Sequence, residues 1–97
     1  MNERILTLHQ TPGKKGVRIS KEKYALIRDQ ILAVVYAEKS VTFSRLMDVI
    51  GENLAGRFDG SIPWYVTTVK LDLEARGEIE RVPNVRPQQL RLCKAAI

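Results

Sequence analysis

The polar side chains best suited to chemistry fall in one stretch of the chain, between residues 64 and 86. Thr67, Thr68 and Lys70 lie within one helical turn of each other, and Arg81 and Arg86 follow after a glycine. Threonine hydroxyls hydrogen-bond to phosphates or base edges, and a lysine neutralises a phosphate or reaches guanine. An arginine beside a duplex contacts phosphates or the minor groove. These residue types favour contact with an anionic partner.

The sequence contains no arrangement of residues that is typical of a catalytic site or a metal site. Cys93 and His9 are the single residues of their types, which excludes an internal disulfide and a cysteine-based zinc cluster. No hydroxyl or thiol is spaced with a base as a nucleophile requires. Gly13 and Gly16 do not form the glycine-rich phosphate loop that follows a strand. We therefore expect no enzyme activity, no metal site and no cofactor.

Positive charge gathers at the two ends of the chain. The net charge is +5, of which residues 1–23 carry +4 and residues 78–97 carry +2, while residues 62–77 are neutral. Lys14 and Lys15 lie in a segment with a proline and two glycines, which predicts a basic loop or arm. Basic ends around a neutral middle suit a surface that faces phosphates, although a solvated surface of modest charge has the same composition.

Length and composition indicate one small soluble domain. The chain has 97 residues, of which 44% are hydrophobic, enough for one packed core. Domains of this size often gain stability by dimerising. No run approaches the ~20 apolar residues of a membrane span, and residues 1–20 lack the apolar core of a secretory signal. We expect a cytoplasmic protein without membrane contact.

Two helices are predicted in the first half of the chain. Ser20 is a candidate N-cap for a helix over residues 21–37, whose apolar residues recur at three- and four-residue spacing. They are Tyr24, Ile27, Ile31, Val34 and Val35. A β-prone link at residues 41–43 follows, and Ser44 is the candidate N-cap of a helix over residues 45–55.

A third helix and a hairpin are predicted in the second half. Ser61 is positioned to cap a helix over residues 62–76, Pro63 suits its first turn, and Gly77 suits its end. The core face of this helix consists of Val66, Val69 and Leu73. Residues 78–82 and 88–94 read as two strands joined by a turn at residues 83–87, which predicts a β-hairpin.

This order of elements resembles the winged helix-turn-helix over Thr42–Leu92, about half of the chain. The segment Trp64–Arg81 is similar to the recognition helix and first wing strand of bacterial regulators of the MarR and PadR type. The matching residues are Val66, Val69, Leu73, Glu74, Gly77, Ile79 and Arg81. The whole chain also resembles small bacterial winged-helix proteins of unknown function.

The resemblance implies an α+β fold, a three-helix bundle with a C-terminal β-hairpin wing. Residues 1–19 would form an N-terminal arm or loop, and residues 20–97 the winged-helix domain. The function expected from it is DNA binding by a small transcriptional regulator, as a homodimer with two helices roughly 34 Å apart. The expected contacts to double-stranded DNA are Trp64, Thr67, Thr68 and Lys70 on the helix, Arg81 and Arg86 on the wing, and Lys14 and Lys15 on the arm.

A second apolar stripe on the third helix favours a different function. Trp64, Leu71 and Ala75 lie opposite the core face, where a helix that reads DNA more often carries arginine or an amide. The stripe packs against the arm through Ile5, Leu6 and Leu8, or it is a dimer or partner interface, or Trp64 touches DNA while Leu71 and Ala75 lie under the wing. The alternative function is a protein-interaction or dimerisation module that does not bind DNA.

Overall fold

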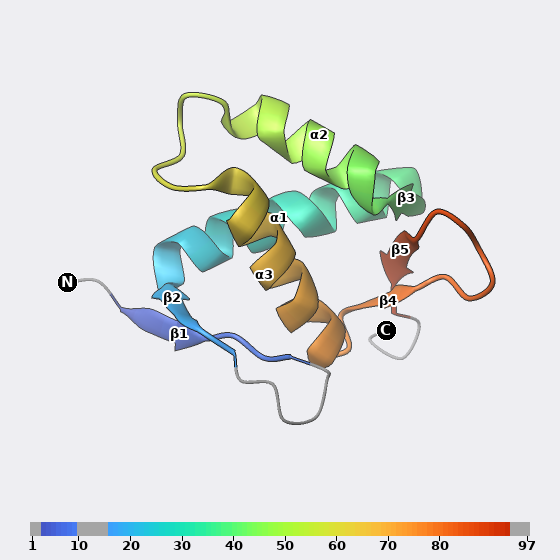
Figure 1. The fold of residues 1–97 in the computed structure, drawn as a ribbon, viewed down its shortest axis with the longest axis horizontal. Helices are drawn as coiled ribbons and strands as arrows, with labels where there is room; N and C mark the ends of the chain where they lie inside the picture. Colours follow the sequence, from blue (N-terminus) through green and yellow to red (C-terminus); the bar gives the residue numbers. More distant parts are fainter. Residues whose placement is uncertain (1–2, 10–15, 94–97) are drawn as a thin grey trace.

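The protein has an α+β fold in which three helices pack with two small antiparallel sheets (Figure 1). The computed structural model describes residues 3–9 and 16–93. The elements in chain order are β1 (Arg4–Leu6), β2 (Arg18–Ser20), α1 (Lys21–Glu38), β3 (Ser40–Thr42), α2 (Phe43–Leu54), α3 (Ile62–Ala75), β4 (Ile79–Arg81) and β5 (Gln89–Leu92). In the described residues, no helix is long and apolar enough to cross a bilayer.

Each helix begins at a side chain that caps its first turn. Ser20 accepts a hydrogen bond from the Lys23 amide at 3.3 Å, and Ser61 accepts one from the Trp64 amide at the same distance. Both caps were predicted. The prediction of Ser44 as the cap of α2 is wrong, because Thr42 accepts the hydrogen bond from the Arg45 amide and α2 begins at Phe43. Thr42 has the extended backbone of the strand that it ends, so the chain passes from β3 into α2 without a loop.

The core lies where the three helices meet the β3–β5–β4 sheet. The predicted apolar faces of α1 and α3 are buried, and α2 buries Leu46, Ile50 and Leu54. Val41 of β3 lies opposite Leu90 of β5, which in turn pairs with Arg81 of β4. Gly77, with φ of +78°, makes the tight reversal from α3 into β4, as the sequence predicts.

The N-terminal segment is part of the packed fold. β1 and β2 pair antiparallel with Ile5 opposite Ile19, and Ile19 is buried in the core. Beyond β1, the chain runs along α3, with Thr7 hydrogen-bonded to the Val17 carbonyl at 2.9 Å. We call Thr7–His9 together with Gly16 and Val17 the docked arm. Figure 1 shows the β1–β2 pair on one side of α3 and the β4–β5 hairpin on the other.

A buried carboxylate joins the docked arm, α1 and α3. Asp72 is fully buried and accepts hydrogen bonds from the Leu8 amide at 2.7 Å and from the Tyr24 hydroxyl. Arg76, one turn later in α3, also donates to it at 2.9 Å. The pKa of Tyr24 is raised to about 12, mainly because the hydroxyl is buried and secondly because it donates a hydrogen bond to Asp72. The neutral tyrosine is thus the form that the fold stabilises.

Replacing Tyr24 with phenylalanine will lower the free energy of unfolding by about 1.5–3 kcal/mol at pH 8, the range for a hydrogen bond to a charged group. Because the pKa is raised on folding, the contribution of the hydroxyl is complete below about pH 10 and is lost as pH rises toward 12. Urea unfolding of both proteins at pH 8, 10 and 11.5 measures the difference. If the difference in unfolding free energy stays constant or grows across this pH range, the neutral Tyr24 hydroxyl is not what stabilises the fold.

Candidate functional site

The N-terminal half of α3 is the part of this helix that faces solvent. Pro63, Trp64 and Thr67 are exposed, and Trp64 retains 45% of its accessible surface. Thr67 donates its hydroxyl proton to the Pro63 carbonyl at 2.8 Å. Thr68 is half-buried. Of the four contacts predicted on α3, Trp64 and Thr67 are thus exposed and Thr68 is exposed in part.

The charged residues of α3 turn inward. Lys70 is 5% exposed, and its Nζ lies 2.7 Å from Glu74 Oε1 and 5.3 Å from the centre of the Phe43 ring. Lys70, which the sequence suggested as a DNA contact, is therefore a buried residue and not an exposed one. Its side chain points toward the start of α2, and Glu74, one turn later, compensates the charge.

The two arginines of the β4–β5 hairpin, Arg81 and Arg86, differ in their partners. Arg81 donates from Nε to Glu74 Oε2 at 2.8 Å, so Glu74 binds Lys70 with one oxygen and Arg81 with the other. Arg86 lies exposed in the loop between β4 and β5 and has no carboxylate partner among the described residues. Of this pair, Arg86 is the cation that remains available to a ligand.

The docked arm covers the C-terminal half of the outer side of α3. Leu8, His9 and Val17 line a small cavity of about 140 Å³ together with Trp64, Thr68 and Leu71. Leu71 and Ala75 are half-buried. Of the three interpretations of the Trp64–Leu71–Ala75 stripe, this geometry favours packing against the arm, although through Leu8 and not through Leu6, which is 47% exposed. Lys14 and Lys15 lie outside the described residues.

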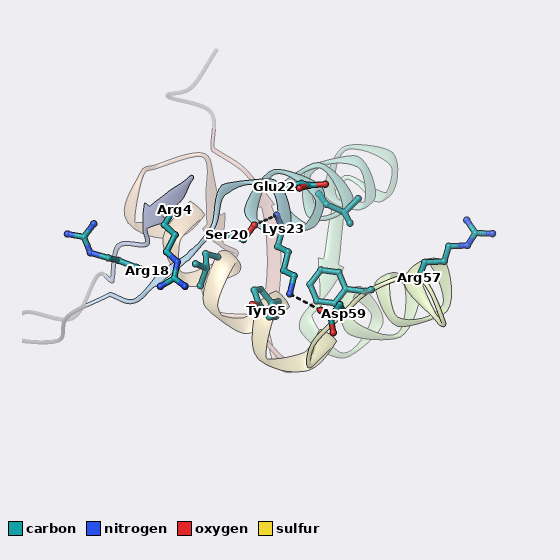
Figure 2. A pocket seen from close by; sticks show the side chains of 11 residues that line it. Arg4, Arg18, Ser20, Glu22, Lys23, Arg57, Asp59 and Tyr65 are labelled. Carbon is teal, nitrogen blue, oxygen red and sulfur yellow. Dashed lines mark hydrogen bonds and ion pairs between the residues drawn. The ribbon is translucent and has the colours of Figure 1, made fainter. Parts of the chain in front are cut away.

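A basic cleft of about 550 Å³ opens beside the start of α3 (Figure 2). Its basic side chains are Arg4 and Arg18 from the β1–β2 pair, Lys23 from α1, and Arg57 from the segment before α3. Lys23 Nζ lies 3.9 Å from Asp59 and above the Tyr65 ring at 5.4 Å. Figure 2 shows Arg4 and Arg18 at one end of the cleft and Arg57 at the other, extending away from the Lys23–Asp59 pair.

Arg4, Arg18 and Arg57 are not among the contacts expected from the sequence. What brings the first two together is the strand register, in which Leu6 pairs with Arg18 and Arg4 with Ser20. The sequence indicated an arm or loop over residues 1–19, so the pairing of β1 with β2 was not foreseen. Arg57 follows the end of α2, and no local pattern marks it.

The arginines of the chain divide into two groups. The first group is paired with carboxylates: Arg28 with Glu78, Arg45 with Glu38, Arg76 with Asp72, Arg81 with Glu74, and Arg91 with Glu80. Hydrogen bonds to their carboxylates raise the pKa of Arg28 and of Arg76. The second group has no carboxylate within ion-pair distance in the described part of the chain: Arg4, Arg18, Arg57 and Arg86. All four are exposed: Arg4 and Arg18 belong to the β1–β2 pair, Arg57 precedes α3, and Arg86 lies between β4 and β5.

Comparison with known proteins identifies a family but no activity. A family model described as a family of unknown function (DUF6958) matches residues 4–90, which span β1 to β5. Neither the curated proteins nor the solved structures include a match.

Lys70 has a structural role in this arrangement, and a substitution tests it. Lys70→Met leaves the buried Glu74 carboxylate with Arg81 alone, so we expect the free energy of unfolding to fall by about 3 kcal/mol. Lys21→Met is the matched control, because Lys21 is exposed and its pair with Glu3 lies at the surface. The control will change stability by less than about 0.5 kcal/mol. If Lys70→Met and Lys21→Met unfold in urea with equal free energies, the Lys70–Glu74 pair does not stabilise the fold.

Proposed function

Because this chain belongs to the family of unknown function DUF6958, we propose its function from its own architecture: it is a winged-helix module that binds double-stranded DNA. A small transcriptional regulator in the cytoplasm is the role that the resemblance in sequence implies. The order α1–β3–α2–α3–β4–β5, with β5 between β3 and β4, supports the winged-helix assignment. In that fold the second helix of the helix-turn-helix enters the major groove, which is α3 in this chain.

The observation that carries the proposal is the placement of the unpaired arginines. Arg4 and Arg18 lie on one side of α3, Arg57 precedes its N-terminus, and Arg86 lies in the wing loop on its other side. An arginine without a carboxylate partner keeps its full charge for phosphates, whereas a paired arginine must first give up its partner. Unpaired cations on both flanks of a neutral helix match two phosphate backbones on either side of a groove.

The proposed contacts differ from those expected from sequence alone. Arg4, Arg18, Arg57 and Arg86 bind phosphates, and Trp64, Thr67 and Thr68 face the groove. Lys70 and Arg81 are left out, because both are held by Glu74. Asp72 and Glu74 do not repel the DNA, because both are buried and hydrogen-bonded or ion-paired to basic side chains.

Binding to a random duplex should weaken linearly with the logarithm of salt concentration. Four phosphate contacts predict a slope of about −3.6, and each removed contact reduces its magnitude by about 0.9. Arg57→Gln tests one contact, and Arg28→Gln is the matched control, since it removes the same charge from an arginine that is paired with Glu78. Fluorescence anisotropy titrations between about 50 and about 300 mM salt provide the readout and must resolve a change of about one slope unit.

The expected result is a reduced slope for Arg57→Gln and an unchanged slope for Arg28→Gln. The combined Arg4, Arg18, Arg57 and Arg86 variant should lose nearly all the salt dependence. An unaltered chain that binds no duplex at low salt, or binds with equal affinity at all salt concentrations, would refute the proposal.

The exposed apolar side chains favour a second candidate function, a protein-interaction module. Trp64 is 45% exposed, and Leu8 and Val17 at the edge of the same small cavity are each 40% exposed. Clustered apolar surface of this kind marks protein contacts. In this case the occupant is a second copy of the chain, as in the homodimer that we expected from the size of the domain.

Self-association is measured by sedimentation of the unaltered chain over a range of concentrations. If the second candidate holds, the chain sediments as a dimer, and Trp64→Ala with Leu8→Ala returns it to a folded monomer. Tyr36→Ala is the control, because Tyr36 is an exposed aromatic residue on α1. A chain that sediments as a monomer at all concentrations rules out this candidate and leaves DNA binding by a single copy.

A further inference from the structure

We propose that α3 selects DNA sites by contact with the methyl groups of thymine. This inference rests on the proposed DNA binding and adds what the helix recognises in the major groove. Thymine is the base that presents a methyl group there, whereas adenine, guanine and cytosine present hydrogen-bond donors and acceptors. The side chains that α3 exposes match the methyl group and do not match the polar edges.

The exposed side chains of α3 lack the groups that bind guanine or adenine through two hydrogen bonds. Its charged residues, Lys70, Asp72 and Glu74, are all buried, and the helix contains no arginine, asparagine or glutamine. Bidentate recognition of guanine requires arginine or lysine, and that of adenine requires asparagine or glutamine. The outward positions instead carry Pro63, Trp64 and Thr67. Apolar contact is the main form of base recognition that remains.

Thr67 is set for the same kind of contact. Its hydroxyl proton is donated to the Pro63 carbonyl at 2.8 Å, within the helix. An incoming base therefore meets the methyl group of Thr67 and an oxygen whose proton is already used. Trp64 lies one turn earlier and is the largest exposed apolar side chain of α3. Its ring also packs edge-on against Tyr65, with 4.9 Å between ring centres, which restricts its orientation.

The docked arm limits the length of α3 that can enter the groove. Thr68 and Leu71 are half-buried beside Leu8, in a cavity that Trp64 also lines. The exposed residues of α3 are Pro63, Trp64 and Thr67, so the open part of the helix is the turn from Pro63 to Thr67. At 1.5 Å per residue this turn is about 6 Å long, which spans about two base pairs at 3.4 Å each. The arginines on both flanks supply the charge complementarity that holds a duplex against this apolar turn. The inferred preference is thus for two adjacent thymines.

Replacement of thymine by deoxyuridine tests the inference on the unaltered chain. The two bases differ in the methyl group and pair identically, so a duplex containing TT steps and its uridine counterpart isolate the contact. Burial of one such carbon contributes ~0.8 kcal/mol, so each contacted methyl should change the dissociation constant by about fourfold. Anisotropy titrations at one salt concentration measure the ratio for the two duplexes.

Variants assign the effect to α3 and separate it from DNA flexibility. Trp64→Ala should reduce the thymine-to-uridine ratio toward one while the salt dependence stays unchanged, because the flanking arginines are intact. Tyr36→Ala should leave the ratio unchanged. Salt-dependent binding with equal affinity for both duplexes would overturn this inference and leave DNA binding standing, and so would a ratio that Trp64→Ala does not alter. Absence of any duplex binding would overturn both.

Discussion

The arrangement of this molecule depends on one buried carboxylate, that of Asp72. A carboxylate with no exposed surface must have its charge compensated and its oxygens hydrogen-bonded, and Asp72 obtains these partners from three separate segments. Leu8 contributes a backbone amide, Tyr24 a hydroxyl and Arg76 a guanidinium. The N-terminal segment is therefore docked by a requirement of the core. Its place over the C-terminal half of α3 follows from that requirement.

The second buried acid of α3 determines where positive charge is available. Glu74 binds Lys70 with one oxygen and Arg81 with the other, so two cations that the sequence suggested as DNA contacts are held by a carboxylate instead. The outer side of α3 is left without charge, and the unpaired arginines lie on the β1–β2 pair, the segment before α3 and the wing loop. The unpaired positive charge is thus separated in space from the surface that α3 presents.

The parts predicted from sequence are those that short-range patterns decide. Ser61, Pro63 and Gly77 mark the ends of α3 by the chemistry of helix termini, and the apolar spacing of α1 identifies its buried face. One error is local, since Thr42 and not Ser44 caps α2. The other errors concern long-range contacts. The Lys70–Glu74 spacing is visible in the sequence, but its burial depends on Phe43 of α2 and on Arg81 of β4. The cleft likewise depends on a strand register that no local pattern specifies.

If the chain binds DNA as proposed, its flanking arginines and its neutral third helix would differ in how they respond to the DNA sequence. Phosphate contacts are the same at every sequence, so the flanking arginines alone would hold this chain equally on any duplex. In the proposed complex with DNA, discrimination must come from α3, whose open turn is short because the docked arm covers the rest. An apolar surface of one turn distinguishes few base pairs, each by a modest factor. High selectivity therefore requires a second reading surface, from the wing or from a second copy of the chain bound beside the first.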